Sequence, residues 1–224
     1  DLKVKNVRLP FSDLLAPHAR ERLRHLARLG FRFSIFSVDI PDERQLKLMK
    51  RYQSAIDTWE INIEWAQLPL LLEVLQKSEN DLSCRIMLSK ILTLSDQTMR
   101  RFHYFSHFVF TGFLADEIPR IEQHAADPVF RSLIDGVCLS IVSEDDEIWE
   151  TGAMCVELTQ RSGIDIDVNI QMKRDAEGIL FHDEAAIANR IAEAFMTALV
   201  SGRTRLYLDT FIDHDRGYMP RLAL

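Results

Sequence analysis

Carboxylate and amide side chains alternate with apolar residues in the segment TWEINIEW, residues 58–65. Successive side chains of a β-strand point to opposite faces, so Glu60, Asn62 and Glu64 would share one face of a strand. A carboxylate at the end of such a strand can act as a general acid or base when it is partly removed from water. Glu60 lies deeper and is better placed to pair with a buried arginine. We therefore predict that Glu64 is a catalytic acid or base.

Three later segments, residues 84–91, 165–171 and 205–211, end in polar side chains that could contact a substrate. Residues 165–171, DIDVNIQ, put Asn169 and Gln171 on one face, where these neutral amides suit hydroxyl groups. Residues 205–211 put Asp209 on their polar face as a second candidate catalytic carboxylate. The residue types predict a small, polyhydroxylated, carbohydrate-like substrate. The expected substrate-binding residues are Ser89, Lys90, Asn169, Gln171, Asp213, Arg216 and Tyr218.

Lys90 allows a different chemistry. Its amine at a strand end could form a Schiff base with a carbonyl substrate, as in a lyase or isomerase. A single lysine at such a place more often contacts a phosphate or carboxylate, or is solvated. Both interpretations of Lys90 are kept.

The polar segments belong to a regular alternation of strands and helices. Runs rich in β-branched and aromatic residues recur eight times, separated by helical stretches without a long linker. Asp42 and Asp183 are typical helix N-caps, and Gly30 and Gly202 are typical helix ends. We expect strands at residues 4–10, 31–38, 58–65, 84–91, 107–111, 136–142, 165–171 and 205–211.

Strict alternation favours parallel strands, because parallel neighbours need a long crossover connection. Eight such units favour closure into a (β/α)8 TIM barrel, which belongs to the α/β class and binds ligands at the carboxyl ends of its strands. We expect residues 1–224 to form one barrel domain, which can be part of a longer chain. The chain ends 13 residues past Phe211, so the closing eighth helix is expected to be missing or to lie beyond the chain end.

Arginines are expected on the same strand faces as the carboxylates. Arg8, Arg32 and Arg85 would share the barrel interior with residues such as Glu60 and Asp167. An isolated buried charge is strongly unfavourable, so these groups are expected to form ion pairs.

The composition excludes several classes of partner. The formal net charge is -7 and no basic patch stands out, so nucleic acid and anionic membrane surfaces are not expected to bind. The mean hydropathy is -0.08, and no apolar run is long enough to span a membrane. The three cysteines form no CxxC pair, which favours buried thiols in the cytoplasm over a disulfide framework.

Motifs for cofactors are lacking. The chain has no GxGxxG, GxxxxGK[ST], GxSxG or HExxH motif, so no nucleotide cofactor is expected. His103 and His107 straddle a predicted helix end and strand start, and the acidic residues 144–147 lie where a helix begins. We expect neither group to hold a metal ion.

The segment after the eighth predicted strand, LYLDTFIDHDRGYMPRLAL, resembles the strand 8 exit of clan A glycoside hydrolases. That resemblance implies a sugar-binding pocket in a barrel. Members of the clan carry an Asn-Glu pair at the end of strand 4 and a Glu at the end of strand 7, where this chain has Ser89-Lys90 and Gln171. The usual mechanism needs both carboxylates. The matching residues are Asp209, Phe211, Asp213, Asp215, Gly217, Tyr218 and Arg221.

Three functions follow from these observations. The first is an enzyme acting on a carbohydrate-like substrate, a hydrolase such as a glycosidase or sugar-lactone hydrolase. The second is a non-catalytic carbohydrate-binding or assembly module, which the unmatched carboxylate pair favours. The third is the lyase or isomerase that would use Lys90.

Overall fold

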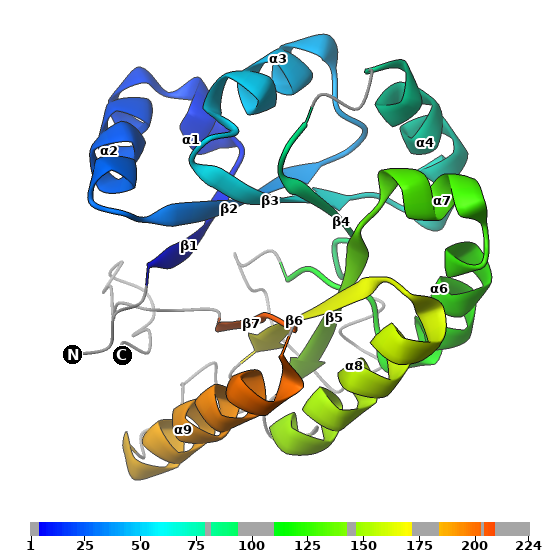
Figure 1. Cartoon of the computed structure of the whole chain (residues 1–224). Coiled ribbons are helices and arrows are strands. Elements are labelled where there is room, and N and C mark those ends of the chain that lie inside the picture. Colours follow the sequence, from blue (N-terminus) through cyan, green and yellow to red (C-terminus); the bar gives the residue numbers. More distant parts are fainter. Residues whose placement is uncertain are drawn as a thin grey trace. The chain divides into compact units, whose positions relative to one another are not determined.

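The computed structural model describes residues 5–78, 82–93, 110–142, 147–171, 184–202 and 204–208. The chain divides into two compact units. The first unit comprises residues 1–90 and 124–136, and the second comprises residues 91–123 and 137–224. Figure 1 labels the helices and strands of both.

The first unit contains four parallel strands with helices between them. β1 pairs with β2, β2 with β3 and β3 with β4, each pair in parallel. Its elements are β1 (Asn6–Pro10), α1 (Ser12–Leu15), α2 (Pro17–Arg28), β2 (Arg32–Val38), α3 (Glu43–Tyr52), β3 (Ile56–Asn62), a 3-10 helix (Trp65–Gln67), α4 (Leu68–Lys77), β4 (Arg85–Ser89) and α7 (Pro128–Leu133).

The second unit continues the same alternation. In it β6 pairs with β7 in parallel, with Asn169 opposite Tyr207. Its elements are a 3-10 helix (Ala115–Glu117), α6 (Ile118–Ala125, whose last two residues belong to the first unit), β5 (Gly136–Val142), α8 (Ile148–Ser162), β6 (Asp165–Gln171), α9 (Glu184–Ser201) and β7 (Leu206–Leu208).

Helix ends follow the predicted local signals. Asp42 caps α3, since its carboxylate accepts from the Gln45 amide at 2.7 Å while its own amide donates to Gln45 Oε1 at 2.9 Å. Gly30 and Gly202 have φ angles of 86° and 66°, which side chains with a Cβ rarely adopt. These predicted ends are confirmed. Asp183 lies outside the described residues.

The strand order distinguishes between α/β architectures. The described strands are ordered β1-β2-β3-β4-β5-β6-β7, in the order of the sequence. Doubly wound sheets reverse their strand order part-way, whereas a (β/α) barrel sheet keeps it sequential. The α/β class and the barrel-type strand order are thus confirmed, and seven of the eight predicted strands occur as strands.

The fifth predicted strand, residues 107–111, is where the prediction departs from the structure. Of its residues, only 110 and 111 are described, and Thr111 forms an isolated antiparallel bridge with Ile91. The Leu92 amide donates to the Phe110 carbonyl at 2.9 Å, so residues 91–92, just after β4, pair with residues 110–111. Two residues later Phe113 forms a parallel bridge with Leu139 of β5. The expectation that every pairing is parallel is therefore wrong at Ile91.

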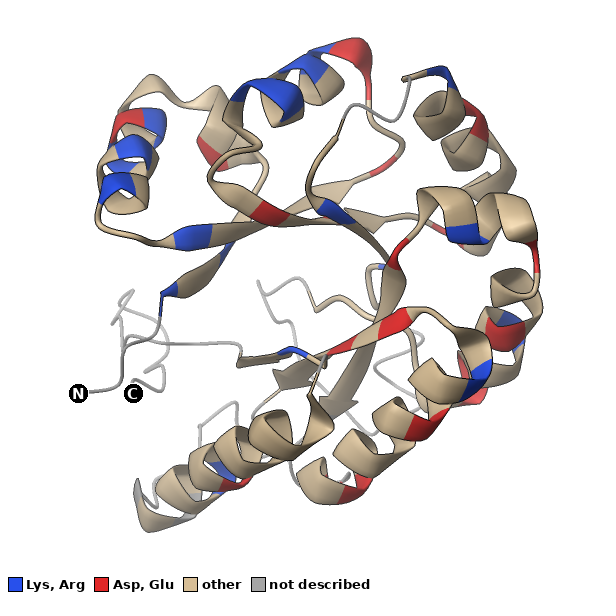
Figure 2. Ribbon diagram, viewed as in Figure 1, with Lys and Arg blue, Asp and Glu red and all other residues tan. Residues whose placement is uncertain are grey.

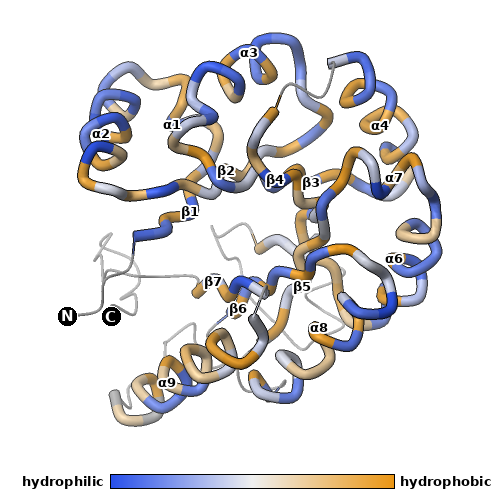
Figure 3. The backbone as a smooth tube through the Cα atoms, in the orientation of Figure 1, coloured by the Kyte–Doolittle hydropathy of each residue, from blue (hydrophilic) through white to orange (hydrophobic). Residues whose placement is uncertain are grey.

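Hydrophilic and hydrophobic residues follow one another along the strands of the first unit (Figure 3), and in β3 this alternation puts Thr58, Glu60 and Asn62 on one face. Ile35, Trp59 and Ile61 are fully buried, and Trp59 stacks on Phe11 with ring centres 6.5 Å apart. The opposite face of β3 carries Glu60 and other polar residues, all of them buried. The predicted separation of the two faces is confirmed in β3.

Candidate functional site

Polar side chains lie at the carboxyl ends of neighbouring strands in the first unit. Asn62 is the last residue of β3 and Ser89 the last residue of β4, and the two are paired in register. Asn62 is 2% exposed and Ser89 is fully buried. Paired residues of parallel strands project from the same face, so these side chains are neighbours. The end of the sheet expected to bind a ligand is therefore polar.

Two oxygen atoms of this pair are buried and unsatisfied. The Asn62 amide nitrogen donates to the Ser37 carbonyl at 3.0 Å. The Asn62 Oδ1 and Ser89 Oγ atoms have no hydrogen-bond partner in the described part of the chain. A buried polar atom without a partner costs about 1–3 kcal/mol. A ligand that supplies hydroxyl groups would satisfy both, because a hydroxyl can donate to Asn62 and exchange a hydrogen bond with Ser89.

Glu64 lies two residues beyond Asn62, in an extended conformation with φ −76° and ψ 150°. Its amide donates to Gln67 Oε1 at 2.9 Å, and the next residue, Trp65, is buried and stacks on His124 with ring centres 5.0 Å apart. The Glu64 side chain is exposed, and its carboxylate forms no ion pair among the described residues. Its backbone is thus anchored while its carboxylate faces solvent.

Lys90 follows Ser89 directly and is 8% exposed. The structure places this lysine directly after the carboxyl end of β4, as expected. Burial distinguishes it from an ordinary solvated surface lysine.

Glu60 has the structural role expected of it. Both of its carboxylate oxygens accept from Arg8, at 2.7 Å from Nε and 2.9 Å from Nη2. The Arg8 guanidinium also lies 4.4 Å from the centre of the Phe36 ring. The predicted pairing of strand-face charges is confirmed for Arg8 and Glu60.

The second unit has its own buried amides on β6. The Asn169 amide nitrogen donates to the Thr111 carbonyl at 3.0 Å and to Thr111 Oγ1 at 2.9 Å, and Asn169 Oδ1 is buried without a partner. The Gln171 amide nitrogen donates to Ser140 Oγ at 2.7 Å. Gln171 is thus held by the protein, whereas Asn169 keeps one acceptor for a ligand.

The position of Thr111 depends on the next residue, Gly112. Its φ of 125° disfavours a side chain, and a Cβ there would lie 2.7 Å from the backbone of Leu139 and Ser140. Glycine is needed for this close backbone approach.

Several site residues were not predicted. Ser37, Thr111 and Ser140 are hydrogen-bond partners of the candidate amides, and Asn62 was assigned to the polar face but not to the site. The alternation in TWEINIEW puts Asn62 on the same face as Glu60 and Glu64, so this pattern could have identified Asn62 as a site residue. Of the predicted site residues, Asp209, Asp213, Arg216 and Tyr218 lie outside the described residues.

The cysteines are unsuited to nucleophilic chemistry. All three are buried, and none forms a disulfide bond. Burial raises the pKa of Cys84 to about 11 and that of Cys155 to about 12, with smaller contributions from the charges of Asp135 and Asp167. Both thiols stay protonated near neutral pH, whereas the thiolate is the nucleophile.

Searches of the described residues for two other features were negative. They contain no cluster of three His, Cys, Asp or Glu side chains that could hold a metal ion. None of the described helices is both long and apolar enough to cross a membrane.

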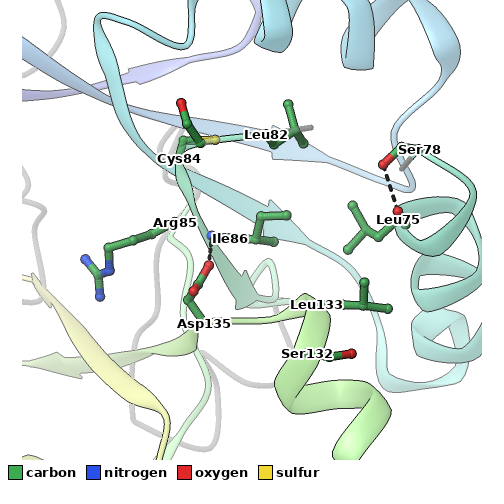
Figure 4. A pocket seen from close by; sticks show the side chains of 10 residues that line it. Leu75, Ser78, Leu82, Cys84, Arg85, Ile86, Ser132, Leu133 and Asp135 are labelled. Atoms are coloured by element: carbon green, nitrogen blue, oxygen red, sulfur yellow. Dashed lines mark hydrogen bonds between the residues drawn. The ribbon is translucent and has the colours of Figure 1, made fainter. Parts of the chain in front are cut away.

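A cavity of about 260 Å³ lies at the other end of β4, where Cys84, Arg85 and Ile86 line it together with Asp135 (Figure 4). The Asp135 carboxylate accepts from the Ile86 amide at 2.7 Å, and the Ser78 hydroxyl donates to the Leu75 carbonyl at 2.7 Å. The Asp135 carboxylate and the Ser78 hydroxyl are thus held by the protein, and the cavity is at the amino end of the strand, opposite Ser89. We therefore do not assign the site to it.

Comparisons with known proteins give one structural likeness to report. No family model matches the chain, and no curated protein matches it. The chain is similar to the crystal structure of the N-terminal domain of a putative aldolase from Bacteroides vulgatus, with 14% sequence identity and a TM-score of 0.42. The match covers 91% of this chain and 56% of that chain, so this chain spans little more than half of that length. These comparisons assign the chain to no family.

Proposed function

We propose that the chain binds a small polyhydroxylated molecule at the carboxyl ends of β3 and β4, and that it acts on this molecule as a hydrolase. The observation that carries the proposal is the in-register pair Asn62 and Ser89, whose Oδ1 and Oγ atoms are buried and unsatisfied. Two hydroxyls of a sugar or sugar acid, each at a hydrogen-bond distance of about 2.8 Å from its partner, could bridge two atoms on neighbouring strands about 4.8 Å apart. An apolar ligand would leave both atoms unsatisfied.

Glu64 is the proposed acid or base. It follows the polar face of β3 and carries an exposed carboxylate that is not committed to an ion pair in the described structure. As an acid, the protonated carboxyl would donate its proton to a leaving oxygen; as a base, the carboxylate would accept a proton from an attacking water, once substrate covers the group. The deeper Glu60 is unsuited to this role because Arg8 occupies both of its oxygens.

The type of hydrolysis follows from the residues at the strand ends. β4 ends in Ser89 followed by Lys90, and β6 ends in Gln171, so neither position carries the carboxylate of a clan A glycosidase. A two-carboxylate glycosidase mechanism is therefore not favoured. Hydrolysis of a sugar lactone needs only one acid or base, which activates the attacking water. Glu64 alone could fill this role. Asp209 is a further candidate carboxylate by sequence.

The test combines binding and turnover. Thermal unfolding is measured with a panel of sugars, sugar acids and lactones, and compounds that stabilise the protein are assayed for hydrolysis. Ser89→Ala removes an unsatisfied hydroxyl, so the free protein should unfold at the same or a higher temperature. The same variant should lose most of the ligand-induced shift.

The matched control is Ser83→Ala, which removes an exposed hydroxyl near the amino end of β4. It should keep the ligand-induced shift of the unmodified protein. Equal shifts in the two variants, or a panel without any stabilising compound, would remove the support for this site. Binding without turnover would favour the non-catalytic alternative.

Lys90 supports a second candidate function, a lyase or isomerase. It follows Ser89 directly in the sequence, at the carboxyl end of β4, and is 8% exposed. The amine would add to a substrate carbonyl and release water to form a Schiff base. Borohydride reduction in the presence of a hydroxy-aldehyde or hydroxy-ketone would trap such an adduct, and its absence from a peptide containing Lys90 would exclude this chemistry.

A further inference from the structure

Basic residues gather on two neighbouring helices of the first unit. α2 and α3 together carry eight Lys and Arg against two Glu, whereas the whole chain has a net charge of -7. Figure 2 shows this concentration of blue on the two helices. The expectation that no basic patch exists is wrong, because the charges are spread over two stretches of sequence that the fold brings together.

A groove lies between these helices. Its outer part has a volume of about 250 Å³ and is lined by Arg20 of α2, by Arg44, Lys47 and Arg51 of α3, and by leucines. Leu15, one of these leucines, is 40% exposed. The groove therefore offers basic side chains around an apolar surface.

A second cavity, of about 390 Å³, shares Leu14 and Arg51 with the groove, and its lining mixes apolar residues with Arg24, Arg28 and Tyr52. Phe33, Ile35 and Ile56 form part of its wall. A cavity of this volume accommodates an apolar side chain of a partner, beside the basic residues at the entrance.

Arginines of the groove and of the second cavity have no acidic partner among the described residues. Arg24 Nη2 donates to the Tyr52 hydroxyl at 2.7 Å, and the Cζ atoms of Arg24 and Arg51 lie 5.5 Å and 5.9 Å from the centre of the same ring. Neither these two nor Arg20 and Arg44 form an ion pair among the described residues. Two guanidinium groups on one ring repel each other, and an anion would offset that repulsion.

We propose that the groove between α2 and α3 binds an acidic, amphipathic segment of a partner protein. Carboxylates of the segment would pair with the groove arginines, and one apolar side chain would enter the cavity next to Leu14. This proposal is independent of the polyhydroxylated ligand, which would bind at the carboxyl ends of the strands. Nucleic acid fits less well, because Phe33 is buried and Arg24 and Arg51 already lie over the Tyr52 ring, so neither ring offers a free face for base stacking.

The probe is a fluorescently labelled peptide in which glutamates flank one leucine, and its anisotropy is measured with the full chain. Two comparison peptides replace either the glutamates by glutamines or the leucine by serine. We expect saturable binding of the acidic peptide that weakens as salt rises. Each comparison peptide should bind about tenfold more weakly.

The groove variant is Arg20→Glu combined with Arg44→Glu. The control, Arg22→Glu combined with Arg131→Glu, makes the same change in net charge at exposed residues that do not line the groove. The groove variant should weaken peptide binding by about tenfold or more, and the control by less than about twofold. Unchanged thermal unfolding shows that both variants are folded.

Several outcomes would overturn the proposal. They are a lack of saturable binding, equal binding of the glutamine peptide, or equal losses in the groove variant and the control. Tighter binding of duplex RNA or of phosphatidylserine vesicles, lost in the same groove variant, would assign the groove to nucleic acid or to a membrane surface instead.

Discussion

Arg8 and Glu60 are joined by two hydrogen bonds across the polar face of the first unit, at 2.7 Å and 2.9 Å. Arg8 belongs to β1 and Glu60 to β3, so the pair spans β2 between them. The Glu60 side chain is 2% exposed and that of Arg8 is 22% exposed. A carboxylate this deeply buried needs its guanidinium partner to offset the cost of removing its charge from water. Breaking the pair therefore measures how much it stabilises the packing of β1 and β3.

Arg8→Met should destabilise the protein by about 3 kcal/mol, near the lower end of the cost of breaking a buried pair, because Arg8 is partly exposed. Urea unfolding measures the loss. Arg32→Met is the control, since Arg32 pairs with Asp57 at 2.7 Å but the two are 44% and 24% exposed. It should cost less than about 1 kcal/mol. Equal losses would mean that the Arg8–Glu60 pair is solvated.

Gly152→Ala should destabilise the packing of α8 against α9. A Cβ at this position would overlap the Thr197 Cγ2 methyl and lie 2.9 Å from Ser201 Oγ. Overpacking of this kind costs about 1–3 kcal/mol. Thr197→Ser removes the methyl group, so the double variant should recover part of the stability lost by Gly152→Ala. Additive losses in unfolding experiments would show that the two residues do not touch.

The raised pKa of Cys155 should make stability fall at alkaline pH. The unfolded thiol loses its proton near its ordinary pKa of 9.0, whereas the folded thiol keeps it up to about 12. The thiol's contribution is therefore complete below pH 9 and is lost as the pH rises toward 12. Between about pH 8 and about pH 10 the loss is about 1.4 kcal/mol.

Cys155→Ala should lose correspondingly less stability between the two pH values, whatever its stability at the lower one. Urea unfolding of both proteins at each pH gives the comparison. Identical pH dependence would contradict the burial of this thiol. In the folded protein, Cys84 and Cys155 should also resist alkylation near neutral pH until urea unfolds the chain.

Glu64→Gln tests the proposed acid or base. The change preserves side-chain volume and removes the titratable proton, so activity on the substrate found by the binding panel should fall by about two to four orders of magnitude. Stability should change little because the side chain is exposed. Glu43→Gln, at an exposed position of α3, is the control and should keep full activity. An intact rate in Glu64→Gln would reject the assignment.

The sequence by itself predicted the features that depend on local periodicity and local capping. Alternating side chains in TWEINIEW and DIDVNIQ located β3 and β6, and Asp42 marked the start of α3. Such signals arise within a few residues, because strand pleating and helix capping involve only near neighbours in the chain. The sequential α/β topology followed from the number and order of these elements.

Only the tertiary structure decided which distant side chains meet. Asn62 and Ser89 form a pair because of the register between β3 and β4, and Arg24 and Arg51 share the Tyr52 ring because α2 and α3 are neighbours. The antiparallel bridge between Ile91 and Thr111 likewise depends on where the chain turns after β4. Pairings of this kind depend on strand register and helix packing, and these are set by burial and hydrogen bonding summed over the whole fold rather than by any local motif.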